Sequence, residues 1–117
     1  MDSMRAGLTL IIITLLLGGC SSMGPTTTAP GSGPAQVLLQ QAQVLKQQGQ
    51  LDRAIALTER AVRIEPRNAY AWYELARLQL AAGHQAKAEQ FAHRSNQLAG
   101  NDPQLRKANR RLIEATR

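Results

Sequence analysis

The feature that most constrains the fold of this chain is a repeat of 34 residues that begins near residue 35. Residues 34 positions apart are identical or similar in five places: Ala42 and Ala76, Gly49 and Gly83, Ala54 and Ala88, Ile64 and Leu98, and Asn68 and Asp102. A fixed period of about 20–50 residues is typical of arrays in which each repeat packs on its neighbours. The segment is rich in alanine, glutamine and leucine, which favour helices. We therefore predict an all-α fold with helices at residues 34–47, 52–64, 69–82, 86–99 and 103–116.

The second repeat resembles a tetratricopeptide repeat, which is a helix–turn–helix unit of 34 residues. Trp72–Ala76 is similar to the opening W-x-x-L-G/A of that family. The turn glycines, the small residues of the second helix and the closing segment also match: Gly49 and Gly83, Ala54 and Ala61, and Ile64–Pro66. The chain departs from the pattern at Leu38, where the other repeat has Trp72, and at Ser95 and Gly100, which replace an alanine and a proline. The resemblance covers residues 35–102 and implies a short α-solenoid of two repeats.

Small and large apolar residues are spaced for close packing of the predicted helices. The small ones let paired helices approach and the large ones fill the space between them: Ala42, Ala54, Ala61, Ala76 and Ala88, and Leu38, Leu45, Leu75 and Leu78. Asn68 and Asp102 suit helix N-caps, and Pro103 suits a first helical turn. The last helix has its apolar residues on one arc, which predicts a helix that caps the array: Leu105, Ala108, Leu112, Ile113 and Ala115.

The first nineteen residues are predicted to be a cleaved leader. The apolar run at residues 6–17 is too short to span a bilayer, which takes about 20 residues, and it follows a short charged start. Leu17–Cys20 resembles the bacterial lipobox, which implies that Cys20 is lipidated and becomes the first residue. Ser21 follows Cys20, and by the same resemblance it favours the outer membrane. The alternative is an uncleaved signal anchor with an incidental cysteine.

A flexible tether is predicted between the lipidated cysteine and the helices. Residues 21–34 contain three prolines and three glycines and no apolar periodicity. A coil of this length spans roughly 20 Å, so we expect the domain to stay close to its membrane. The predicted organisation is a leader, the lipidated cysteine with its tether, two repeats and a basic capping helix: residues 1–19, 20–34, 35–68, 69–102 and 103–117.

Catalysis is not expected. One cysteine and two histidines are fewer than the four ligands of a structural zinc site. His84 and His93 are expected on the surface, as are the scattered acids, which include Glu74. No nucleophile elbow, phosphate-binding loop or H-E-x-x-H motif occurs. We predict no enzyme activity, no cofactor and no metal.

A partner-binding groove is the candidate functional site. In tetratricopeptide proteins the first helices of successive repeats line a concave groove, and Tyr70, Tyr73 and Arg77 share one face of such a helix. Residues 34 earlier and 34 later bring Gln36, Leu39, Gln43, Gln104, Lys107 and Arg111 alongside, with Lys46 one turn beyond Gln43. The predicted groove residues are Lys46, Tyr70, Tyr73, Arg77, Lys107 and Arg111. The alternative is that the tyrosines only cover the packed helices.

The net charge of +6 comes mostly from the last helix, which has five bases and one acid. These bases either form a solvated face or dock an acidic partner segment or an anionic membrane surface. Nucleic acid is not an expected partner for a lipid-anchored periplasmic domain. Two repeats with a cap are few for a stable array, so a homodimer is a further possibility.

The predicted function is that of a non-catalytic adaptor, anchored in the outer membrane and facing the periplasm. Small lipoproteins of this kind resemble regulators of peptidoglycan synthases, pilotins of pilus or secretion secretins, and assembly factors for outer-membrane proteins. The short tether and the small number of repeats favour a peptidoglycan synthase regulator. The alternatives are a pilotin or assembly factor, a self-associating structural lipoprotein, and a protein that binds the cell-wall polymer itself.

Overall fold

The computed structural model describes residues 33–117, and in this part of the chain the secondary structure is entirely helical. The helices are α2 (Pro34–Gln47), α3 (Leu51–Ile64), α4 (Ala69–Ala81), α5 (Gln85–Leu98) and α6 (Pro103–Ala115). Each helix lies within one residue of its predicted range, and the predicted all-α fold is confirmed. The predicted leader, Cys20 and nearly all of the tether lie outside the described residues, so they stay predictions.

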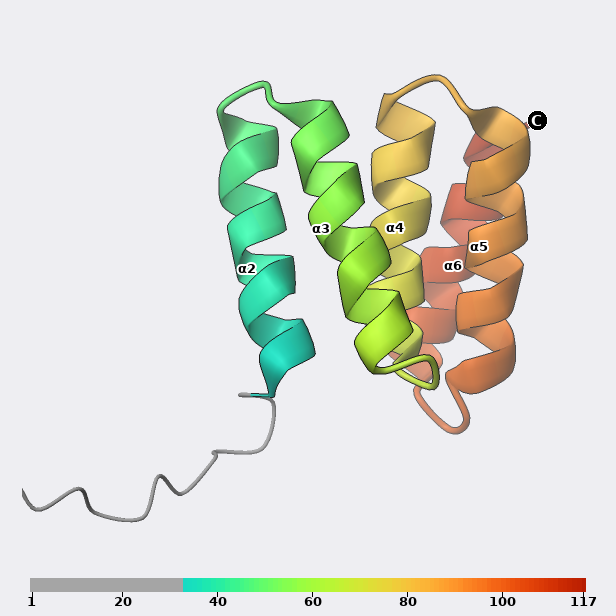
Figure 1. Ribbon diagram of the computed structural model, residues 1–117. Helices are drawn as coiled ribbons and strands as arrows, with labels where there is room; N and C mark the ends of the chain where they lie inside the picture. The colour runs from blue at the N-terminus through green and yellow to red at the C-terminus, as the bar shows by residue number, and fades with distance from the viewer. Residues whose placement is uncertain (1–32) are drawn as a thin grey trace, which may run out of the picture.

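The helices form two antiparallel pairs followed by a single helix (Figure 1). α2 packs on α3 and α4 packs on α5, while contacts between α3 and α4 join the two pairs. α6 packs mainly on α5 and also touches α4, and α2 touches α4 as well. The helices α2, α4 and α6 therefore share one side of the array, and α3 and α5 form the other.

Alanines at the helix contacts let the backbones approach closely. Ala54, Ala61, Ala76 and Ala88 are fully buried and Ala42 nearly so, as predicted from their spacing. Leu75 lies in a cluster with residues from both helices of the first pair, which joins the two pairs: Ala35, Leu39, Ala61, Val62 and Ala71. A second cluster attaches α6 to the second pair through Leu112 and Ile113.

The helix ends follow from local chemistry. The Asn68 side chain accepts a hydrogen bond from the Ala71 amide at 3.1 Å, and Asp102 accepts one from the Leu105 amide at 2.9 Å. Both are N-caps, as the sequence predicted. Gly49 and Gly83 end the first helix of each pair with φ angles of 76° and 81°. This left-handed conformation is inexpensive for glycine alone, which explains why the turn glycines recur at the repeat spacing.

The prediction for the buried side of α6 is partly wrong. Leu112 and Ile113 are buried, but Ala115 is exposed in the last turn and Leu105 and Ala108 are only partly covered. Asn109, which the apolar arc left out, is completely buried. Its Nδ2 donates to Ser95 Oγ at 2.9 Å, and that hydroxyl donates to the Ala69 carbonyl oxygen at 2.7 Å. Hydrogen bonding thus links α6, α5 and α4 where an apolar contact was expected.

Candidate functional site

One face of α4 carries a compact polar cluster at the centre of the array. The rings of Tyr70 and Tyr73 have centroids 6.1 Å apart, and the Arg77 guanidinium lies 5.7 Å from the centre of the Tyr73 ring. The helical period places these side chains on one face, as the sequence predicted. The Tyr73 ring and the Glu74 carboxylate thus both hold the Arg77 guanidinium in place.

The prediction that Glu74 lies on a solvated face is wrong. Its side chain is buried, and one oxygen accepts a hydrogen bond from Arg77 Nη1 at 2.9 Å. Burial, the largest single influence, lowers the pKa of Arg77, but the charge of Glu74, its hydrogen bond and the two tyrosines together outweigh burial, so the pKa is raised. Burial, followed by the charge of Glu74 and a hydrogen bond to it, also raises the pKa of Tyr70. Glu74 therefore fixes the position of Arg77 and contributes a negative charge to the cluster.

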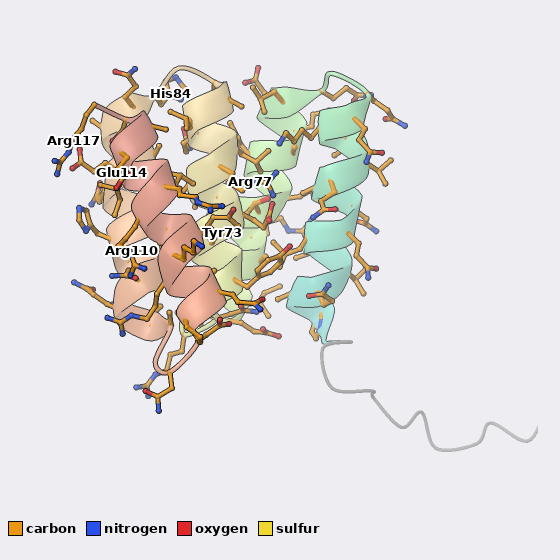
Figure 2. All side chains as sticks on the ribbon, turned by 180° about the vertical axis from the view of Figure 1, so that it is seen from behind. Tyr73, Arg77, His84, Arg110, Glu114 and Arg117 are labelled. Atoms are coloured by element: carbon orange, nitrogen blue, oxygen red, sulfur yellow. The ribbon has the colours of Figure 1, made fainter. Side chains whose placement is uncertain are left out.

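A hollow of about 430 Å³ lies beside this cluster, and it is lined from three helices. Lys46 comes from α2, Tyr73 and Arg77 come from α4, and Arg111 comes from α6. The apolar part of the lining is made by four smaller or aliphatic side chains: Leu80, Ala81, Ala108 and Leu112. The side chains of Tyr73 and Arg77 lie between α6 and the first helical pair (Figure 2). We call these eight residues the basic groove.

The structure brings together four of the six predicted groove residues. Tyr70 is 41 % exposed and lies outside the lining beside Tyr73, and Lys107 is exposed and also outside the lining. Leu39, which was expected alongside, is buried in the core. A smaller hollow of about 250 Å³ adjoins the basic groove and is lined by Gln43, Lys46, Gln47, Glu74 and Arg77.

The four apolar residues of the basic groove, Leu80, Ala81, Ala108 and Leu112, were not predicted from the sequence. Leu80 follows Lys46 by 34 positions, so the repeat spacing could have found it. Leu112 and Ala108 were assigned to the capping contact, yet both also line the basic groove because α6 turns one edge of its apolar arc toward it. The pairing of Glu74 with Arg77 had only one indication in the sequence, which is that the two residues are three positions apart.

The basic groove holds three bases around an apolar floor, and Glu74 lines the adjoining hollow. This arrangement complements a segment that carries carboxylates and an apolar side chain, because the bases can donate charge-assisted hydrogen bonds. α6 divides its bases between two sides. Arg111 lines the basic groove, while Arg110 lines a separate hollow with His93 and Arg117. Figure 2 shows Arg110 and Arg117 on the side of α6 away from Tyr73 and Arg77.

The histidines lie away from the basic groove. His84 is at the N-terminus of α5, with Nδ1 2.7 Å from Gln79 Oε1, and His93 pairs with Glu89 at 3.7 Å on the exposed side of α5. Within residues 33–117 no cluster of three or more His, Cys, Asp or Glu side chains could hold a metal ion. No helix in that range is long and apolar enough to cross a membrane.

Comparisons with known proteins agree with the helical geometry. The sequence pattern of the tetratricopeptide repeat matches residues 45–112, from the end of α2 into α6. The chain belongs to the tetratricopeptide repeat family. It is also similar to the solved globular C-terminal domain of P. aeruginosa LpoP, with 40 % sequence identity and a TM-score of 0.71. That match covers 73 % of this chain and 80 % of the LpoP domain. A search of curated protein sequences gave no match.

Proposed function

We propose that this tetratricopeptide protein is a non-catalytic adaptor that binds an acidic segment of a protein partner in the basic groove. The observation that carries the proposal is the convergence of Lys46, Arg77 and Arg111, from three different helices, on one hollow with an apolar floor. Bases held by neighbours lose little freedom on binding, and Arg77 is already positioned by Tyr73 and Glu74. Complementary charge would speed encounter and select the partner.

We also propose that the protein is a lipoprotein of the outer membrane, facing the periplasm, and that it regulates a peptidoglycan synthase. The lipobox-like Leu17–Cys20 supports the anchor. The LpoP match is to a C-terminal domain, which agrees with an N-terminal segment that precedes the helices. At 40 % identity the two helical domains are close enough that we propose that they share a class of partner. The short tether favours a partner that reaches toward the outer membrane.

Reversing charges of the basic groove, without disturbing the fold of the domain, tests whether the groove binds the partner. Arg77 is unsuitable, because its removal strands the buried carboxylate of Glu74. Lys46 and Arg111 are exposed at the margins, so Lys46→Glu with Arg111→Glu changes the charge alone. A photo-crosslinking phenylalanine analogue at Tyr73 of the full chain should capture a cell-wall synthase in cells. The double variant should reduce that capture about tenfold or more.

Arg94→Glu with Arg110→Glu is the matched control, since it makes the same total charge change at two exposed positions outside the basic groove, one of them next to Arg111 in α6. Its capture should stay within about twofold of the unaltered chain, because a screened charge on another face adds little to binding. Equal capture by the double variant and the control would rule out the groove as the binding site. Capture of a protein other than a cell-wall synthase would rule out the proposed class of partner.

The anchor proposal has its own test. Cys20→Ser removes the thiol that would carry the diacylglycerol, so we expect loss of palmitate labelling and transfer of the chain from the membrane to the soluble fraction. Two or more acyl chains are needed for stable anchoring, and each buried methylene contributes about 0.8 kcal/mol. The Ser21→Ala change should leave both labelling and fractionation unaltered. An unlabelled wild-type chain would contradict the lipoprotein assignment.

A further inference from the structure

The N-terminal end of the array has an open apolar face. Among residues 33–117, three of the four large hydrophobic residues that are exposed lie on the first helical pair: Val37 is 47 %, Val44 52 % and Ile64 48 % exposed. Val37 and Val44 are seven residues apart and share one face of α2, the helix at the outer edge of Figure 1. α6 covers the opposite end of the array, but no described helix covers this one. An array end needs a polar cap to stay soluble alone, and within residues 33–117 this end exposes two valines, Val37 and Val44, where such a cap would be polar.

The face is uncharged along α2 and slightly hollowed. Its exposed stripe reads Val37, Gln40, Gln41 and Val44. Lys46, the single charged residue of α2, points instead into the basic groove. A hollow of about 410 Å³ runs between α2 and α3 on this side, lined by Gln41, Val44, Leu45, Arg53 and Leu57. Arg53 donates to Gln50 Oε1 at 2.6 Å, so the one base of the hollow already has a partner.

We propose that a second copy of this chain covers the open face, through two-fold packing of α2 against α2. A two-fold interface must be self-complementary, because the same patch faces itself. Valines meet this condition, and glutamine amides do too, since each both donates and accepts hydrogen bonds. The net charge of +6 is concentrated at the other end of the array, because residues 103–117 hold five bases and one acid and so account for +4 of it. Pairing through α2 keeps the two basic helices apart, whereas pairing through α6 would bring them together.

Other occupants fit the face less well. The residues directly before α2 include one large apolar side chain, Met23, so residues 21–32 offer little to bury. A partner recognised by charge would find no charge on the α2 stripe. The face is also small: a helix of 14 residues is about 21 Å long, which predicts a weak contact. Confinement of two copies to one membrane would raise their effective concentration, which favours a test in cells over dilute solution.

The test places a photo-crosslinking amino acid at Gln41 of the full chain, in cells that make two differently tagged copies. We expect an adduct that carries both tags. The same probe at Gln97, which is exposed on α5, should give none. Val37→Glu with Val44→Glu should reduce the adduct about tenfold or more, because the charges of one copy would face those of the other.

The control is Gln90→Glu with Gln97→Glu, which adds the same charge at two exposed positions of α5 with the same spacing along the helix, and should leave the adduct unchanged. Because all four altered side chains are exposed, both doubly altered chains should unfold at the same temperature as the parent. An adduct only to lipid or to another protein, only within one chain, or of equal yield in the valine variant would overturn the proposal. The inference does not rest on the proposed function: Lys46→Glu with Arg111→Glu should reduce partner capture about tenfold or more while the two-tag adduct persists.

Discussion

Replacing Leu75 by alanine is expected to destabilise the domain by about 3–4 kcal/mol, a large share of the roughly 5–15 kcal/mol of a typical domain. Leu75 is 1 % exposed and packs between the two helical pairs, against Leu39 of α2 and Val62 of α3. Its truncation removes burial and leaves a cavity in the cluster that joins the pairs. Urea unfolding followed by helicity would give the free energy change.

Leu75→Met is the matched control, because it keeps the volume and the apolar character. It should cost less than about 1.5 kcal/mol. The Leu75→Ala variant should also unfold less cooperatively, since the cluster that couples the pairs is loosened. A loss below about 1 kcal/mol would mean that the pairs are not held together at Leu75.

The second large effect is expected at Asn109, where aspartate should cost several kcal/mol. The site is completely buried, Nδ2 donates to Ser95, and Oδ1 has no hydrogen-bond partner. An aspartate there would bury a carboxylate without a cation, which is among the costliest substitutions. Burial would raise the pKa of that carboxyl in the folded state above its unfolded value. The free energy of unfolding of the variant should therefore rise as the pH falls through the raised pKa, because a protonated carboxyl costs less to bury than an ionised one.

Asn109→Leu separates charge from shape at this site. Leucine removes the unpaired oxygen and the donor together, and Ser95 keeps its own hydrogen bond to the Ala69 carbonyl oxygen. The change should alter the free energy of unfolding by no more than about 1 kcal/mol, because it leaves no buried hydrogen-bond donor without an acceptor. Thermal unfolding of both variants at neutral and acid pH is the measurement. Equal loss in both variants would show that shape, and not charge, decides how α6 docks.

The sequence predicted the helices well because helix formation depends on local chemistry. Asn68 and Asp102 cap their helices, and Gly49 and Gly83 end them, through contacts a few residues away along the chain. The repeat spacing also placed the alanines at the helix contacts. Each of these features is visible in a short window of sequence.

The environment of individual polar residues was harder to predict, because it depends on which helix lies opposite. Glu74 was expected on a solvated face and Asn109 outside the buried arc of α6, but Glu74 is buried with a hydrogen bond to Arg77, and Asn109 is buried with a hydrogen bond to Ser95 of α5. Helical periodicity gives the direction of a side chain and not what meets it. For the same reason, both Lys107 and Arg111, which are one turn apart, were expected in the basic groove. Of these two residues, the structure places only Arg111 in the lining.

The order of helix packing also bears on how the domain assembles. Each helix packs chiefly on the next one along the chain, and the contacts that skip a helix, α2 with α4 and α4 with α6, are few. Such short-range topologies close only small chain loops and reach the folded state in about microseconds to milliseconds. Each helical pair can therefore form from its own residues without a distant segment, and folding can begin at either pair and spread to the other.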